Sequence, residues 1–161
     1  MPGLFNYDDP SAACFADHTA ILCDLTDAEW DVLIGYMERK LFPAGTRIVK
    51  VGDNDHTLYL VVSGEVDLIV EGPKGPVRIL TVTEGSTFGE VGFFDHEPRS
   101  AHAIARGAVE VLALCPARLE QLVAWQPRLA HKLVMELGRV LSMRLRKLSR
   151  NWAVALAGRL P

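Results

Sequence analysis

Short runs of β-branched and apolar residues, each bounded by glycine, proline or another turn residue, fill the middle of this 161-residue chain. Such runs predict short strands joined by tight turns. Strands are expected at residues 46–51, 58–63, 65–70, 77–83, 102–105 and 109–114. Residues 71–76 carry the strongest turn signal, EGPKGP, and should join two antiparallel strands. Many short strands of this kind favour a sandwich or jelly-roll barrel over a parallel α/β sheet.

Helical patterns flank the β region. Thr26 and Glu29 form a capping box, and the apolar spacing after them predicts a helix that ends near Lys40. Pro116 and Pro127 fit the first turns of two further helices, the second of them long. We therefore expect one mainly β domain, a double-stranded β-helix or jelly-roll β-roll with flanking helices. Its expected parts are an N-terminal arm (1–24), a helix (25–40), a β-roll (41–115) that contains a ligand cassette (88–103), and C-terminal helices (116–161).

Composition narrows the class of protein. Hydrophobic residues make up 49% of the chain, which argues against disorder, and the net charge of -3 gives no case for a nucleic-acid-binding protein as a whole. The three cysteines, Cys14, Cys23 and Cys115, show no CxxC spacing, so reduced thiols are expected. Neither a transmembrane run nor a signal peptide stands out. We expect a soluble, cytoplasmic protein with no membrane partner.

Residues 88–103 have the chemistry of a pocket for a small anion. Gly89 and Gly92 let a ligand approach the backbone amides, and a short helical turn at residues 90–94 would point its free amides at an anion. Arg99 offers a fork of donors that suits phosphate, whereas Glu90 would repel phosphate unless it faces a hydroxyl of the same ligand. A sugar phosphate meets both demands. The alternative is a structural ion pair between Glu90 and Arg99.

Two motifs resemble the cyclic nucleotide-binding domain family, which includes the catabolite activator protein, kinase regulatory subunits and gated channels. FGEVGF at residues 88–93, followed by RSA at residues 99–101, resembles the family's phosphate-binding cassette. IVKVGD at residues 48–53, followed by LYLVVSG at residues 58–64, resembles its early β-roll strands. Two residues depart from the family's pattern: Asp55 stands where a small residue is usual, and Phe93 where an aliphatic residue is usual.

The resemblance implies a role for each matching residue. Arg99 would pair with a cyclic phosphate, Glu90 would accept the ribose 2′-hydroxyl, and amides near Gly89, Ser100 and Ala101 would complete the phosphate cradle. The implied nucleotide-binding residues are Phe88, Gly89, Glu90, Val91, Gly92, Arg99, Ser100 and Ala101. Rough alignment adds Leu80 and Arg144 as base contacts, although Arg144 could instead be solvated. The implied ligand is cAMP rather than cGMP, and no metal is expected.

The long C-terminal helix carries an apolar seam and a basic face. The seam alternates spacings of three and four, which is typical of a two-stranded coiled coil and predicts a homodimer; the alternative is a stripe packed on the chain's own barrel. Its residues are His131, Val134, Gly138, Leu141, Leu145, Leu148, Trp152 and Ala155. The basic face either is solvated or binds a nucleic acid or membrane surface. Its residues are Arg139, Arg144, Arg146, Lys147, Arg150 and Arg159.

No enzyme is predicted. The five histidines show no HxH or HxxxH pair, and no GxxxxGK[ST], GxSxG or HExxH motif is present. Few residues follow Trp152, so we expect no DNA-binding domain in this chain. The prediction is a stand-alone cyclic nucleotide sensor that signals allosterically through its C-terminal helix to an unidentified protein partner. The alternatives are a nucleotide-free interaction or dimerisation module, and a regulatory-domain fragment of a transcription factor.

Overall fold

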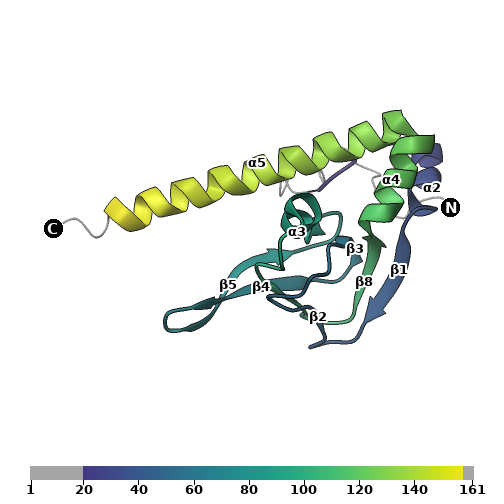
Figure 1. The fold of residues 1–161 in the computed structure, drawn as a ribbon. Helices are drawn as coiled ribbons and strands as arrows, with labels where there is room; N and C mark the ends of the chain where they lie inside the picture. The colour runs from purple at the N-terminus through teal and green to yellow at the C-terminus, as the bar shows by residue number, and fades with distance from the viewer. Residues whose placement is uncertain (1–19, 158–161) are drawn as a thin grey trace.

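A β-roll lies beneath a long helix in the computed structural model, which describes residues 20–157 (Figure 1). Within this range, eight strands pair antiparallel in two four-stranded sheets, with the orders β1-β8-β3-β6 and β2-β7-β4-β5. The strands are β1 (Glu38–Phe42), β2 (Arg47–Val49), β3 (Leu58–Ser63), β4 (Val66–Gly72), β5 (Gly75–Val82), β6 (Thr87–Phe88), β7 (His102–Ala105) and β8 (Val109–Leu114). Two antiparallel four-stranded sheets with flanking helices confirm the predicted jelly-roll β-roll.

The helices begin where the sequence signals place them. They are α2 (Asp27–Ile34), α3 (Glu90–Asp95), α4 (Pro116–Trp125) and α5 (Pro127–Ala157). The capping box of α2 is formed: the Thr26 side chain accepts from the Glu29 amide at 3.2 Å, and Glu29 accepts from the Thr26 amide at 2.9 Å. Pro116 occupies the first turn of α4, where its missing N–H costs no hydrogen bond.

One helix is shorter than its pattern predicts, because a strand begins where the helix was expected to continue. Helix α2 ends at Ile34, and residues 38–42 form β1, which pairs with β8 from Glu38↔Ala113 to Phe42↔Val109. The strand β6, only two residues long, was also not predicted; it pairs with β3. Both strands form because they pair with segments that are distant in the sequence, and local strand propensity does not reveal such pairing.

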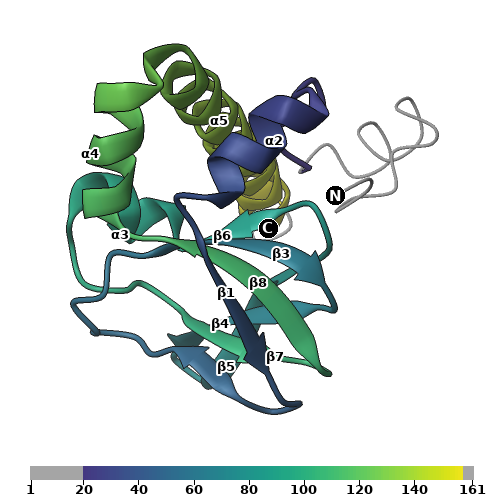
Figure 2. The same ribbon diagram turned by 90° about the vertical axis from the view of Figure 1, so that its right-hand side faces the viewer.

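Strand β3 separates two hydrophobic cores, which explains its continuous apolar run. Leu58, Leu60 and Val62 pack in one cluster with residues of α2, α4 and α5. Tyr59 and Val61 point to the other face and pack inside the β-roll. Alternate residues of a strand face opposite sides of its sheet, so a strand buried on both faces is apolar throughout. Figure 2 shows α2, α4 and α5 together on one side of this sheet.

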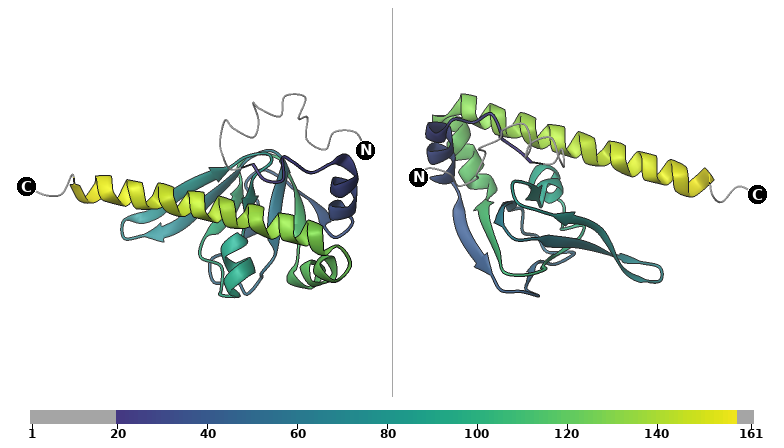
Figure 3. Two further views of the ribbon diagram at one scale, coloured as in Figure 1. Left: turned by 90° about the horizontal axis from the view of Figure 1, so that it is seen from above. Right: turned by 180° about the vertical axis from the view of Figure 1, so that it is seen from behind.

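The two halves of helix α5 differ in burial. With 31 residues it is about 46 Å long, and it crosses above the strands and passes over the β4–β5 hairpin (Figures 1 and 3). Its first half packs on the helical core through Leu129, Ala130, Leu133, Leu137 and Val140. Its second half is largely exposed, and large apolar side chains of the predicted seam lie in the open there: Leu145 is 65% exposed, Leu148 52% and Trp152 68%.

The basic residues of α5 do not form one free face. Arg139 donates to Glu136 and to the carbonyl of Ala20, both at 2.8 Å. Arg144 turns inward, as described below. Arg146, Lys147 and Arg150 are exposed, and Arg159 lies outside the described residues.

The structure also tests the predictions about cysteines and membrane spans. Cys23 is disulfide-bonded, so the prediction of reduced thiols is wrong at this position; Cys115 is free and exposed. Cys14 lies outside the described residues. Among the helices described, none is long and apolar enough to cross a membrane.

Candidate functional site

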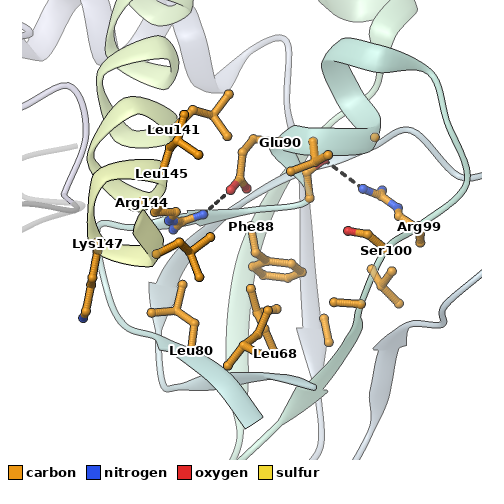
Figure 4. A pocket seen from close by; sticks show the side chains of 18 of the residues that line it. Leu68, Leu80, Phe88, Glu90, Arg99, Ser100, Leu141, Arg144, Leu145 and Lys147 are labelled. Carbon is orange, nitrogen blue, oxygen red and sulfur yellow. Dashed lines mark hydrogen bonds and ion pairs between the residues drawn. The ribbon is translucent and has the colours of Figure 1, made fainter. Parts of the chain in front are cut away.

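A cavity of about 520 Å³ lies between the β-roll, helix α3 and the second half of α5 (Figure 4). Every residue that the sequence assigned to the nucleotide site lines it, although these residues come from β5, the β6–α3 junction, the segment before β7, and α5. They are Leu80, Phe88, Gly89, Glu90, Val91, Gly92, Arg99, Ser100, Ala101 and Arg144. The fold therefore brings the predicted residues together, while their roles toward a ligand stay predictions.

Gly89 shapes the turn that opens helix α3. Its φ of +84° lies in the left-handed region, which glycine adopts without steric strain because it has no Cβ. A Cβ at this position would lie 2.7 Å from Arg99 Nη1 and 2.8 Å from the carbonyl oxygen of Thr57. Glu90 follows as the first residue of α3 and is 5% exposed. Glycine is therefore required here both for the backbone angle and for the close approach of Arg99.

Arg99 is buried, at 4% exposure, and its position is fixed by the protein. Its Nη1 donates to the carbonyl of Gly89 at 2.9 Å, and its Nη2 donates to the carbonyl of Thr57 at 2.5 Å and to Asp55 at 2.7 Å. Its Cζ lies 5.9 Å from the centre of the Tyr59 ring. Protein groups alone thus hold the guanidinium between the start of α3 and the start of β3.

Asp55, which departs from the family's pattern, is the charged partner of Arg99. Its carboxylate also accepts from the Thr57 hydroxyl at 2.6 Å, the Thr57 amide at 3.1 Å and the Tyr59 hydroxyl at 3.2 Å. Burial alone would raise the pKa of Asp55, but hydrogen bonds from Thr57 and Arg99 outweigh it and hold that pKa below its ordinary value. Burial and the charge of Asp55 together raise the pKa of Tyr59 to about 12.

A second ion pair joins the cassette to helix α5. Nη1 of Arg144 donates to Oε1 of Glu90, and Nη2 of Arg144 donates to the carbonyl of Thr87 at 2.6 Å. The two side chains are 15% and 6% exposed, so the pair is largely removed from water. Sequence reasoning considered Glu90 with Arg99 as a possible ion pair, and did not find this one, because Glu90 and Arg144 lie 54 residues apart.

Several buried polar atoms on residues that line the cavity have no protein partner within residues 20–157. These include the buried side-chain atoms Glu90 Oε2, Arg99 Nε and Arg144 Nε. In the turns and loops of residues 20–157, the amides of Ser100 and Ala101 make no backbone–backbone hydrogen bond. Native proteins leave few buried polar atoms unsatisfied, so their concentration in one place indicates a site that a polar ligand completes.

The rest of the cavity wall is mostly apolar, and α5 contributes both apolar and polar side chains to it. Val49, Leu68, Ile79, Leu80, Phe88, Ala103, Leu141, Leu145 and Leu148 supply aliphatic or aromatic surface. Ser142, Lys147 and Asn151 are polar lining residues that sequence reasoning missed. Their spacing from Arg144 places Lys147 and Asn151 near its side of the helix, and that periodicity was the signal that could have identified them. A cavity with one polar end and an apolar wall suits a ligand of mixed character.

No group of three or more His, Cys, Asp or Glu side chains that could hold a metal is found in the described part of the chain.

Comparison with known proteins gives a consistent result. A sequence profile described as the cyclic nucleotide-binding domain matches residues 39–125. The cyclic AMP receptor protein of Thermus thermophilus is 37% identical over 116 residues, which cover 71% of this chain and 54% of that protein. A cAMP-dependent protein kinase regulatory subunit of Aspergillus niger is 32% identical over 100 residues, which cover 62% of this chain and 24% of that protein. The chain thus spans about half or less of these relatives.

Solved structures share the architecture. A cyclic nucleotide-binding domain from Methylobacillus flagellatus matches with a TM-score of 0.76 and 30% identity, over 85% of this chain and 76% of that chain. The Thermus thermophilus catabolite activator protein matches with a TM-score of 0.70 and 32% identity, over 81% of this chain and 60% of that chain.

Proposed function

Because the chain belongs to the cyclic nucleotide-binding domain family, we propose that it is a regulatory protein, not an enzyme, that binds a cyclic nucleotide in the cavity beneath α5. We propose cAMP as the ligand in preference to cGMP. Two sequence relatives named for cAMP support this choice, as does the sequence Arg99-Ser100-Ala101.

The observation that carries this proposal is the pair of unsatisfied atoms at the cavity. Arg99 Nε is a buried donor without a partner, and Glu90 Oε2 is a buried acceptor without one. Both residues line the same cavity and lie apart in it, with Phe88 between them in the view of Figure 4. A ligand that offers a phosphate to the donor and a hydroxyl to the acceptor satisfies both atoms, and a cyclic ribose phosphate offers this combination.

Other groups of the cavity would bind the rest of the nucleotide. The amides of Ser100 and Ala101 and the opening turn of α3 would donate to the phosphate oxygens. The base would lie against the apolar wall that includes Leu80 and Leu145. Charged hydrogen bonds to the phosphate would each contribute on the order of 1.5–3 kcal/mol.

Helix α5 is the element through which occupancy would be transmitted. Arg144 binds the same carboxylate, Glu90, that would accept the ribose hydroxyl, so a ligand would act on the partner that anchors α5. Leu145 and Leu148 lie on the same helix, line the cavity and are more than half exposed. A ligand beneath them would change the apolar surface that α5 presents. We propose that this surface, with Trp152, forms a homodimer or meets a protein partner.

One observation favours the alternative of an interaction module whose cavity binds no nucleotide. Both terminal nitrogens of Arg99 already donate to protein groups, and Oε1 of Glu90 is already paired with Arg144. In that case the unsatisfied atoms would be met by water alone, and α5 would be held in one position by its ion pair.

Calorimetry on refolded, nucleotide-free protein separates the two functions. The proposed function predicts saturable binding of cAMP, and weaker binding of cGMP. Arg99→Met should then lose roughly 2–5 kcal/mol of binding free energy, because it removes a buried charge partner of the phosphate. Arg78→Met is the matched control, since Arg78 is exposed, belongs to the same β-roll and does not line the cavity. Absence of binding, or equal affinity of Arg99→Met and the wild type, would contradict nucleotide binding at this site.

A further inference from the structure

Arg99 makes contacts with two neutral carbonyls and with one charged carboxylate, and the two kinds of contact have different effects. The carbonyls of Gly89 and Thr57, at 2.9 Å and 2.5 Å, are neutral acceptors on two separate segments, and together they fix where the guanidinium lies. Asp55, at 2.7 Å, is the carboxylate that contacts Arg99 within residues 20–157. Its contact adds a negative charge. Two neutral contacts therefore hold Arg99 even without Asp55, whereas the net charge of the Arg99–Asp55 pair depends on Asp55.

We propose that Asp55 is an internal counter-ion that competes with an anionic ligand for the charge of Arg99, and so lowers the affinity of the cavity. This inference rests on the proposed function, because it concerns the phosphate end of the same site. Asp55 does not line the cavity, so it acts on the ligand only through Arg99 and by its charge.

Asp55 is well placed for this role in the ligand-free protein. A guanidinium that is 4% exposed is costly to bury without a negative partner, and Asp55 supplies that partner. The Thr57 amide, the Thr57 hydroxyl and the Tyr59 hydroxyl hold the carboxylate in position. These donors favour the ionised carboxylate, so the negative charge persists at neutral pH and stays beside Arg99 when a ligand arrives.

The consequence for binding has a definite sign. A bound phosphate would meet a positive group that is already partly neutralised, and it would also lie near a fixed negative charge. Removing that charge while the two carbonyl contacts remain should strengthen binding. Asp55 has a side-chain exposure of 42%, so water screens part of the effect. For a half-exposed charge near a bound anion, the expected change is about tenfold in affinity.

Asp55→Asn tests the inference, because asparagine keeps the shape and can still accept from Thr57. Titration with cAMP should give a dissociation constant about tenfold lower than that of the wild type. The melting temperature of the ligand-free variant should fall, since Arg99 loses its counter-ion, and saturating cAMP should raise that temperature by more than in the wild type. Asp55→Glu, which restores the charge, should return the affinity toward the wild-type value.

Asp67→Asn is the matched control. Asp67 also accepts from a threonine hydroxyl, that of Thr81 at 2.7 Å, and also lies near an arginine, Arg78 at 3.6 Å, but Arg78, unlike Arg99, does not line the cavity. This variant should bind cAMP like the wild type. Damage to the fold would weaken binding, so tighter binding by Asp55→Asn cannot come from a purely structural role.

The possible results separate the inference from the function on which it rests. If the wild type binds neither cAMP nor cGMP, the proposed function fails and the role of Asp55 in affinity fails with it. If the wild type binds cAMP but Asp55→Asn binds it equally or more weakly, the function stands and the counter-ion role is wrong.

Discussion

Gly89→Ala tests how the cassette turn positions Arg99. The structure places a new Cβ at this position 2.8 Å from the Thr57 carbonyl oxygen and 2.7 Å from Arg99 Nη1. The carbonyl belongs to the backbone just before β3 and cannot move freely. The arginine can move only by giving up its bonds to Gly89, Thr57 and Asp55.

The magnitude follows from two separate costs. A left-handed φ costs a non-glycine residue about 1–2 kcal/mol. Overpacking against a fixed neighbour adds about 1–3 kcal/mol. The expected loss of unfolding free energy is therefore about 2–5 kcal/mol. Gly45→Ala is the control, since Gly45 has a similar φ of +77° and nothing within 4 Å of a built Cβ. It should pay only the first cost, about 1–2 kcal/mol.

Urea unfolding of the ligand-free proteins, followed by calorimetry with cAMP, measures both consequences. Gly89→Ala should be clearly less stable than Gly45→Ala and should bind cAMP more weakly, whereas Gly45→Ala should bind like the wild type. Replacement of glycine by alanine also lowers the entropy of the unfolded chain, but this contribution is the same in both variants and cancels. Equal stability of the two variants would refute the reasoning about close packing at Gly89.

Three further predictions test other parts of the site. Arg144→Met should still bind nucleotide, but hydrogen exchange of α5 should no longer change when nucleotide binds, because the ion pair between α5 and Glu90 is lost. Arg146 is an exposed residue of the same helix, so Arg146→Met should keep that change. Burial and a neighbouring carboxylate raise the pKa of Tyr59 to about 12, so this group should lower stability as pH rises from about 10 to about 12, and Tyr59→Phe should show a smaller loss over that interval. Trp152→Glu should weaken self-association in sedimentation experiments, whereas Trp125→Glu, on α4 and also largely exposed, should not; equal effects would contradict an α5 interface.

The sequence could predict the elements and the cassette because their signals are local. Turn residues separate the strand-forming runs, and β3, β7 and β8 have the bounds that the pattern predicts. The capping box and Pro116 mark helix starts through groups within one turn of each other. Glu90 and Arg99 drew attention because acid, glycine and arginine within sixteen residues have an evident chemical use. In each case the interacting groups are close in the chain.

Only the tertiary structure decided the partners of the charged groups. Arg99 meets Asp55 across 44 residues, and Glu90 meets Arg144 across 54. The strands β1 and β6 form for the same reason, since each is defined by a distant strand beside it. Local sequence restricts the backbone angles and the face of an element, but an ion pair or a strand edge depends on which segments the folded chain brings together. The sequence therefore determined which groups the cavity could use, and the fold determined which of them it leaves unpaired.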